Sequence, residues 1–376
     1  MGASLSSNPT GTGEISSVEC HFCLEQPEVL AKAGGRKINL MNRRTFSTLS
    51  LAAAFVPLAR LPMAQPAASD RVGFQFAAIN NGLLTVRHGG MARVGVAVDD
   101  DTRFQVASCS KTVTSLAVLT LVRDGHLALD AAANQYLRRW RLPGLRGDTV
   151  TIAELMSHTA GTSIHGFAGY GPSEDLPDLF EILSGRAPAN SGAVRAQPRL
   201  FGKFRYSGGG TMVLQALIED VTGDAFSTYT SRAVLRPIGA SRATYAIAPQ
   251  VDIAHGTYES GQRVEGGFRR HPESAAAGLW ATASDLARIL QAVLDSLRRK
   301  RRAILPFELA TRMITPVSHQ SGLGVFVEPD RVIWHEGRNY GFDAIMAAEL
   351  ATGRVRAAVV NRNGAIERYA QGLLPQ

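Results

Sequence analysis

The sequence predicts an α+β fold in which one antiparallel sheet is assembled from both ends of the folded chain. Strand-like segments occur near the start of the folded part and return in its last third. A long helix-rich stretch lies between these two groups of strands. Because sheets and helices must bury their apolar faces against one another, this order implies a sheet flanked by helices, with a helical lobe inserted into it.

The first strands are marked by a turn. Two apolar segments at residues 74–79 and 83–86 flank the sequence Asn-Asn-Gly at 80–82. Asn-Gly pairs accept the left-handed backbone that a two-residue hairpin turn requires, so we expect a β-hairpin here. A third strand is expected near residues 94–98.

The remaining elements follow from apolar periodicity and from glycine-rich breaks. The helices are expected at residues 108–123, 130–139, 151–158, 176–183, 210–222, 284–297, 307–315 and 365–374. The later strands are expected at residues 323–327, 331–335, 344–350 and 355–360. Loops at 161–171 and 185–202 separate the helices of the middle part, and no internal repeat is present.

The sequence Ser-x-x-Lys at 108–111 lies at the start of a long apolar helix that ends at Asp124-Gly125. Residues three apart share one helix face, about 5–6 Å apart between Cβ atoms. A serine hydroxyl becomes a useful nucleophile only when a neighbouring group takes its proton, and a desolvated lysine can do so. The alternative is that Ser108 caps the helix and Lys111 faces solvent, because this motif is also common by chance.

Composition excludes several other classes of protein. The 376-residue chain has a formal charge of +8, and its densest basic cluster occupies residues 298–302, directly after an expected helix. Cations at a helix C-terminus complement the helix dipole, and no nucleic-acid-binding fold is visible, so we expect no nucleic-acid partner. Cys20 and Cys23 form a single C-x-x-C pair, without the second pair that a zinc site needs. His335-Glu336 lacks the second histidine of H-E-x-x-H, so no metal or other cofactor is expected.

The N-terminal part resembles an export signal. Arg43-Arg44 follows Met41 and precedes an apolar segment at 49–61, as in twin-arginine signals, and this segment is too short to span a bilayer. We expect residues 1–66 to comprise an upstream tail and this signal, with Met41 the true start and residues 67–376 the exported, periplasmic domain. The helical lobe is expected at about 105–250. The alternative is a retained surface helix that covers the sheet.

Four segments in this order resemble the class C β-lactamase and penicillin-binding-protein-like serine hydrolases. They are the nucleophile segment at 101–111, the segment Leu-Met-Ser-His-Thr-Ala-Gly at 155–161, Tyr-Ser-Gly at 206–208, and His-Glu-Gly at 335–337. The last two stand where the family has Tyr-x-Asn and Lys-Thr-Gly or His-x-Gly. The resemblance covers about residues 74–364 and implies the fold of β-lactamases and DD-peptidases.

The resemblance also implies roles for individual residues. Ser108 would attack an acyl carbonyl and form an acyl-enzyme, with Lys111 and Tyr206 sharing the work of the base. The lysine cation is expected to lower the pKa of the tyrosine. The backbone N–H groups of Ser108 and Arg338 would form the oxyanion hole. The expected substrate-binding residues are His335, Gly337 and Gly208.

The sequence departs from the family pattern in two ways. Gly208 replaces the asparagine whose amide would contact an acylamino group, and only residues 69–73 separate the expected signal from the first strand, so no counterpart of the family's N-terminal helix is expected. His335 stands where the family has lysine or histidine, and here it replaces a charged lysine. An unperturbed histidine is mostly neutral at pH 7, so carboxylate-bearing substrates are expected to bind better as the pH falls toward 6. His158 is expected to be buried and hydrogen-bonded rather than catalytic, and His165 to line the cleft.

Together these features predict a serine hydrolase that cleaves an ester or amide in a small molecule or short peptide. The alternatives are a true β-lactamase and a non-catalytic penicillin-binding or scaffold protein with the same fold. No membrane span is expected in the mature protein. The sequence leaves the oligomeric state, the acyl group and the leaving group open.

Overall fold

The computed structural model describes residues 72–197 and 201–366. The expected signal at 41–61, the boundary near residue 66 and most of the expected helix at 365–374 lie outside the described residues. Among the helices within the two described ranges, none has the length and apolar character needed to cross a membrane.

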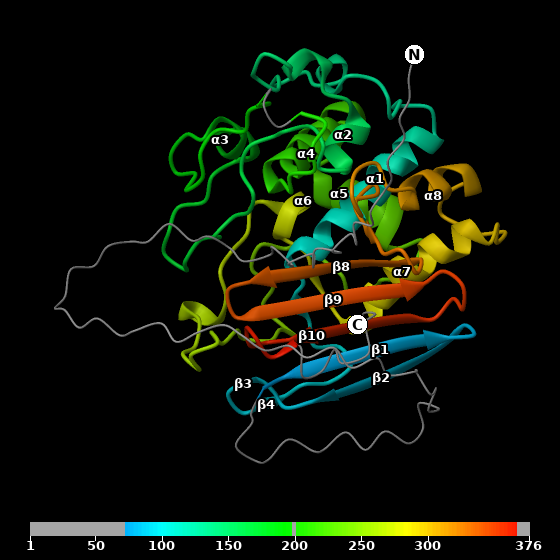
Figure 1. Ribbon diagram of the computed structural model, residues 1–376. Helices are drawn as coiled ribbons and strands as arrows, with labels where there is room; N and C mark the ends of the chain where they lie inside the picture. Colours follow the sequence, from blue (N-terminus) through cyan, green and yellow to red (C-terminus); the bar gives the residue numbers. More distant parts are fainter. Residues whose placement is uncertain (1–71, 198–200, 367–376) are drawn as a thin grey trace, which may run out of the picture. The chain divides into compact units, whose positions relative to one another are not determined.

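A six-stranded antiparallel sheet forms the centre of the fold, in the order β2-β1-β10-β9-β8-β7. Its strands are β1 (Phe74–Asn80), β2 (Leu83–Gly89), β7 (Phe326–Val327), β8 (Val332–Asn339), β9 (Phe342–Glu349) and β10 (Val355–Val360). Figure 1 shows the blue hairpin of β1 and β2 lying directly beside the red strand β10. The predicted α+β fold class, with a sheet made from both ends of the chain, is confirmed.

The two faces of the sheet are packed differently. Ala77 and Ile79 of β1 join the main core, where α7 (Ala283–Leu297) packs against β1, β9 and β10. This helix starts with a capping box between Thr282 and Asp285, which satisfies backbone N–H groups that the first turn would otherwise leave free. On the opposite face, smaller apolar clusters form, one around Phe74 and another around Ile345.

Two shorter strand pairs complete the β-structure. The expected third strand at 94–98 is a small hairpin of β3 (Met91–Arg93) and β4 (Val96–Ala97), because Gly95 adopts a positive φ of 74° and reverses the chain. The pair β5 (Phe104–Gln105) and β6 (Trp280–Ala281) joins segments far apart in sequence. Two-residue strands carry no detectable alternation, so the sequence did not indicate this pair.

The helical lobe is built around α1 (Ser110–Arg123), whose residues 110–121 are all buried. As predicted, this helix ends at Asp124, and Gly125 follows with a φ of 78°. The other helices are α2 (Ile152–Met156), α3 (Leu179–Ser184), α4 (Gly208–Thr222), α5 (Phe226–Thr230), α6 (Ser274–Ala277) and α8 (Phe307–Ile314). Of these, α5 and α6 were not expected from the sequence.

The expected helix at 130–139 is wrong. Only a single 3-10 turn, Ala133–Gln135, forms there. The backbone N–H groups of Arg138 and Arg139 donate to the carboxylate of Asp220 on α4, at 2.7 and 3.2 Å, and are therefore not available for helical bonds. A tertiary contact thus overrides the local helical pattern.

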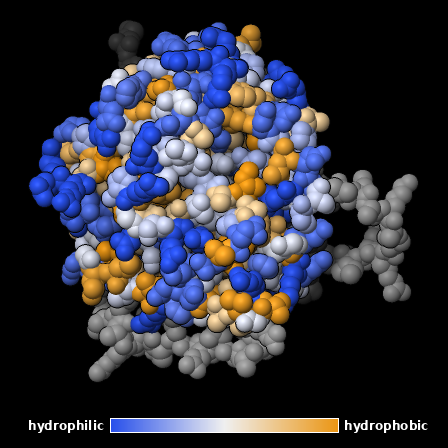
Figure 2. Space-filling view, turned by 180° about the vertical axis from the view of Figure 1, so that it is seen from behind, coloured by the Kyte–Doolittle hydropathy of each residue, from blue (hydrophilic) through white to orange (hydrophobic). Residues whose placement is uncertain are grey.

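Helices α1, α4 and α6 gather beyond the edge of the sheet that β8 forms (Figure 1). From the opposite side, Figure 2 shows small hydrophobic patches scattered among hydrophilic side chains. Four elements meet in the lobe: the start of α1, the start of α4, α6 and the open edge of β8. The residues that the sequence singled out lie at this junction.

Candidate active site

Ser108 lies in a tight 3-10 turn, Ala107–Cys109, directly before α1. Ala107 has a φ of 45°, a left-handed conformation that is strained for a residue with a side chain. The turn is held by Ser110, whose hydroxyl donates to the carbonyl of Ala107 at 2.5 Å and accepts from the N–H of Leu279 at 3.1 Å. Ser108 is partly exposed while its neighbours on both sides are buried, so its hydroxyl is the accessible group of this turn.

Lys111 is buried one turn further on, with 3% of its surface exposed. Its Nζ atom lies 2.9 Å from Ser108 Oγ and donates to the carbonyl oxygen of Ala276 at 2.8 Å. Burial lowers the pKa of Lys111 from 10.5 to about 7. A substantial fraction of the amine is therefore unprotonated near neutral pH, with a lone pair available beside the serine hydroxyl.

Helix α6 supplies the carbonyl that holds Lys111, and two other helices fix its position. The hydroxyl of Thr114 on α1 donates to the carbonyl of Ala275 at 2.9 Å. The side-chain oxygen of Gln215 on α4 accepts from the N–H of Ala275 at 3.1 Å. The contact with Ala276 could not be predicted from the sequence, because a backbone carbonyl carries no residue-type signal.

Tyr206 completes the group around the nucleophile. Its hydroxyl is hydrogen-bonded to Ser108, and the Lys111 Nζ lies 4.9 Å from the centre of its ring. Burial raises the pKa of the Tyr206 phenol well above 10, and the negative charge of Glu336 adds a smaller increase. The expectation that this pKa is lowered is therefore wrong, because desolvation by burial sets its direction.

Aromatic and imidazole rings surround Tyr206. His158 lies 4.5 Å from it between ring centres, His165 at 5.1 Å, His335 at 6.3 Å and Phe326 at 6.4 Å. His158 is buried and its Nδ1 accepts from the N–H of Ser207 at 3.3 Å, while His165 is exposed. The loop and strand that bring His165 and Phe326 here are distant in sequence from Tyr206, so the ring cluster is a property of the fold.

His335 is the most deeply buried of these rings, with 1% of its surface exposed. Its Nδ1 lies 2.7 Å from the carbonyl oxygen of Glu336, and its Nε2 has no hydrogen-bond partner within the described residues. Burial, together with a smaller effect of Lys111, lowers its pKa from 6.5 to about 3. His335 therefore stays neutral at pH 6, and the expected gain in carboxylate binding at that pH is wrong.

The edge of β8 comes very close to the nucleophile turn at Gly337. A Cβ atom on Gly337 would lie 2.1 Å from the carbonyl oxygen of Val106 and 2.9 Å from the backbone nitrogen of Ser108. Only glycine fits this approach. The sequence predicted a substrate-binding role for Gly337 and did not indicate this contact.

The backbone of β8 has one free edge beside this contact. Val332 directs its carbonyl to the β7 side, where it accepts from the N–H of Glu328 at 2.8 Å. Peptide groups alternate along a strand, so Arg338, six residues further on, presents its N–H to the same edge. This N–H and that of Ser108 thus lie on adjoining backbone segments. The Arg338 side chain turns away and donates to Asp343 at 2.9 Å.

Gly208 starts α4 and is packed against the loop that carries His165. A Cβ atom there would lie 3.0 Å from the ring of Phe167 and 3.1 Å from the carbonyl oxygen of His165. That carbonyl also accepts from the N–H of Gly208 at 2.9 Å. The loop thus occupies the space in which a larger side chain at residue 208 would lie.

Glu336 is a site residue that the sequence analysis did not single out. It is partly buried, and its carboxylate makes no hydrogen bond or ion pair with residues 72–197 or 201–366. Burial raises its pKa, and its charge in turn acts on Tyr206 and Cys109. Within the same described ranges, no group of three or more His, Cys, Asp or Glu side chains is placed to hold a metal ion.

Comparison with known proteins agrees with this fold. A family model described as Beta-lactamase matches residues 58–373, most of the chain. The chain therefore belongs to the Beta-lactamase family, as the motifs predicted.

Several members of this class are similar to the chain. Esterase EstB of Burkholderia gladioli is 30% identical over 175 residues, 42% of this chain and 44% of the esterase. The chain spans about half or less of the length of the curated relatives it matches first.

Two solved structures share the fold. An octameric penicillin-binding protein homologue from Pyrococcus abyssi has a TM-score of 0.65 at 22% identity, covering 80% of this chain and 73% of that one. The D-amino acid amidase of Ochrobactrum anthropi SV3 has a TM-score of 0.64 at 19% identity, covering 78% of this chain and 86% of the amidase. At these identities the likeness concerns the fold alone.

Proposed function

We propose that the protein is a serine hydrolase that forms an acyl-enzyme on Ser108 and cleaves an ester or amide bond. The observation that carries this proposal is the 2.9 Å separation between Ser108 Oγ and a buried Lys111 Nζ whose pKa is about 7. A nucleophile and a base within hydrogen-bonding distance, with the base held by a third group, are the essential parts of covalent acyl transfer. Here the third group is the Ala276 carbonyl.

The first half-reaction uses the neutral amine. Lys111 accepts the proton of the Ser108 hydroxyl as Oγ bonds to the substrate's acyl carbon, and the carbonyl oxygen becomes negative. The backbone N–H groups of Ser108 and Arg338 stabilise that oxyanion, and one such donor contributes about 3–4 kcal/mol to the transition state. The bond to the leaving group then breaks.

Proton return completes each half-reaction. The proton held by Lys111 passes to the leaving alcohol or amine, and Tyr206, a neutral phenol hydrogen-bonded to Ser108, is the relay. Lys111 is then neutral again and accepts a proton from the water that attacks the acyl-enzyme. The water oxygen bonds to the acyl carbon and the bond to Oγ breaks. Lys111 returns its proton to Oγ, and the acid product leaves with the serine hydroxyl and the neutral amine restored.

Three features favour neutral esters and amides over carboxylate-bearing β-lactams. His335 is uncharged, Gly208 offers no side-chain amide, and Glu336 adds negative charge on the strand beside which an extended substrate would lie. Aromatic rings around Tyr206 suit an apolar acyl or leaving group. The similarity to an esterase is consistent with this preference.

A substrate panel tests the proposal. Nitrophenyl esters, D-amino-acid amides and a chromogenic cephalosporin should be incubated with the protein and with Ser108→Ala. We expect hydrolysis of at least one ester or amide, slower cephalosporin turnover, and no activity in Ser108→Ala. Lys111→Ala and Tyr206→Phe should each lose activity. The loss of transition-state stabilisation in the double variant should be smaller than the sum of the two single losses, because the residues act as a unit. A non-catalytic scaffold would give no turnover of any substrate.

A further inference from the structure

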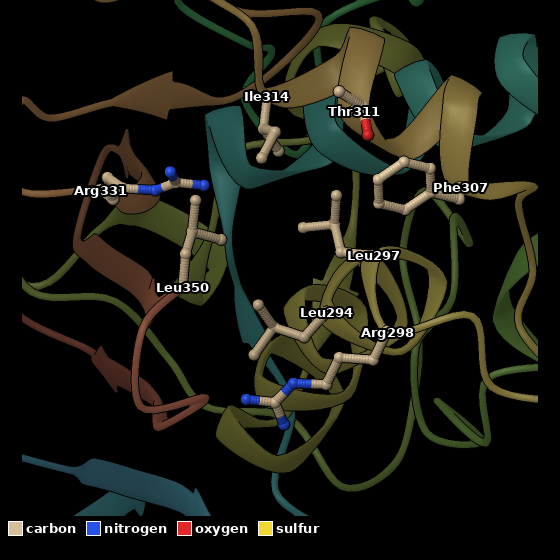
Figure 3. Close-up of a pocket in the computed structure, with 8 residues that line it drawn as sticks. All are labelled: Leu294, Leu297, Arg298, Phe307, Thr311, Ile314, Arg331 and Leu350. Carbon is tan, nitrogen blue, oxygen red and sulfur yellow. The ribbon is translucent and has the colours of Figure 1, made fainter.

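A second concave site lies between the end of α7, α8 and the turns that follow β7 and β9. Figure 3 shows its walls, formed by Leu294 and Leu297 of α7, Phe307 and Ile314 of α8, and Leu350 after β9. Its volume is about 280 Å³, near the lower end of the range for small-molecule pockets. None of Ser108, Lys111 and Tyr206 lines it, so it is separate from the proposed catalytic group.

Two arginines flank this apolar space. In Figure 3, Arg331 lies beside Leu350, and Arg298 lies below Leu294. Both are exposed, and neither forms an ion pair with residues 72–197 or 201–366. The Arg298 guanidinium packs over the turn at Gly353, where an added Cβ atom would lie 1.9 Å from it. The hollow therefore combines an apolar interior with two cations that the described protein does not neutralise.

The neighbouring hollow provides an internal comparison. It is lined by Arg123, Arg299 and Lys300 and has a similar volume of about 330 Å³. Each of its cations has an acidic partner: Arg299 pairs with Glu308 at 3.1 Å, Lys300 with Asp295 at 2.8 Å, and Arg123 with Asp124 at 2.7 Å. The cations Arg298 and Arg331, unpaired within the described residues, therefore distinguish this hollow from the neighbouring one, whose cations are all paired.

A polar atom inside the hollow also lacks a partner. The hydroxyl oxygen of Thr311, on α8, is shielded from solvent and makes no hydrogen bond to the described residues. Figure 3 shows this oxygen directed toward the space between Phe307 and Leu297. Shielded hydroxyls without a partner are uncommon in folded proteins, because their desolvation is not compensated. With so little exposed surface this oxygen offers the hollow no polar contact, so the wall at Thr311 is effectively apolar.

We propose that this hollow binds an amphiphilic anion, a single-chain carboxylate of medium length. The apolar chain would pack against Leu294, Leu297 and Phe307, and the carboxylate would lie at the rim between Arg298 and Arg331. Guanidinium groups match carboxylates in geometry and charge. A concave site of this size accommodates one detached chain, whereas the surface of a bilayer is flat and would not enter it.

Calorimetric titration with decanoate tests the proposal. We expect decanoate to saturate one site per chain and to bind more tightly than octanoate, which buries less apolar surface. Decanol, which lacks the charge, should bind more weakly. The variant Arg298→Glu with Arg331→Glu should weaken decanoate binding by about tenfold or more, as expected for lost charge-assisted hydrogen bonds. Because both residues are exposed, circular dichroism should show an unchanged fold.

The matched control is Arg301→Glu with Arg302→Glu, which makes the same change of charge on two exposed cations outside the hollow. It should leave decanoate binding within about twofold, since general surface charge is screened by salt. Three results would overturn the proposal. They are an equal loss of decanoate affinity in both double variants, unchanged decanoate binding by the Arg298→Glu, Arg331→Glu variant, and equal affinity for decanol and decanoate. Binding to phosphatidylglycerol vesicles without binding of decanoate would also overturn it. Hydrolysis of nitrophenyl acetate, measured in parallel, reports separately on the catalytic proposal.

Discussion

Lys111 Nζ lies 2.9 Å from Ser108 Oγ in an environment that lowers the pKa of the amine to about 7. The same amine donates to the carbonyl of Ala276, so its position is fixed from a helix distant in sequence. This arrangement makes Lys111, rather than Tyr206, the group that can act as a base near neutral pH. The reaction proposed for the protein depends on that difference between the two side chains.

The first prediction concerns the pH dependence of hydrolysis. Below a pH of about 7, Lys111 is protonated and cannot accept the serine proton, so kcat/KM should rise with pH along a titration centred near that value. The measurement is kcat/KM for a neutral nitrophenyl ester between about pH 5 and about pH 9, with the pH-dependent rate of free hydrolysis subtracted. A titration centred near 10, where an unperturbed lysine or tyrosine ionises, would contradict the assignment.

The second prediction concerns the charge of His335. Because burial lowers its pKa to about 3, the imidazole should stay neutral throughout the range in which exposed histidines titrate. In two-dimensional NMR of the histidine ring protons, the signals assigned to His335 with a His335→Gln variant should not move between about pH 5 and about pH 8. Titration of the His335 signals near pH 6 would show that the ring is more accessible than its 1% exposed surface indicates.

The third prediction tests the close approach of β8 to the nucleophile turn. Gly337→Ala would place a methyl group 2.1 Å from the carbonyl of Val106, so the strand or the turn must move and the two oxyanion donors must separate. We expect kcat to fall roughly 10²-fold or more, as when one such donor is lost.

Gly192→Ala is the matched control for this substitution, because its added Cβ would meet nothing nearer than the Ile164 side chain at 3.7 Å. It should keep nearly full activity. Activity of Gly337→Ala equal to that of the control would mean that the proposed oxyanion site is in the wrong place.

The fourth prediction concerns selection against anionic substrates. Glu336→Gln keeps the size of the side chain and removes its charge, so it should raise kcat/KM for a carboxylate-bearing cephalosporin by about fivefold to tenfold, corresponding to roughly 1 kcal/mol between partly screened charges. A neutral nitrophenyl ester should change much less. The comparison should be repeated at high salt, where the gain should shrink. An equal gain for both substrates would indicate a change in the catalytic group and not in electrostatic selection.

Much of the fold and the identity of the central residues follow from the sequence, for local reasons. Ser108 and Lys111 are one helical turn apart, and the Asn-Gly turn and the apolar segments define β1, β2 and the C-terminal strands. The features that could not be predicted from the sequence depend on tertiary packing. The depth of burial that sets the pKa of Lys111 and of His335 comes from packing, and the Ala276 carbonyl comes from a four-residue helix without a sequence signal. The two corrected expectations, for the pKa of Tyr206 and of His335, both failed because desolvation sets the direction of the shift, and desolvation is not visible in a list of neighbouring charges.

Covalent labelling of Ser108 tests the central claim most directly. Intact-mass measurement after treatment with a fluorophosphonate should show a single adduct per chain, and peptide mapping should locate it on Ser108. Ser108→Ala should remain unlabelled, while Cys109→Ala, a change at the buried neighbour, should still be labelled. Equal labelling of Ser108→Ala, or an adduct mapped to another residue, would contradict the account.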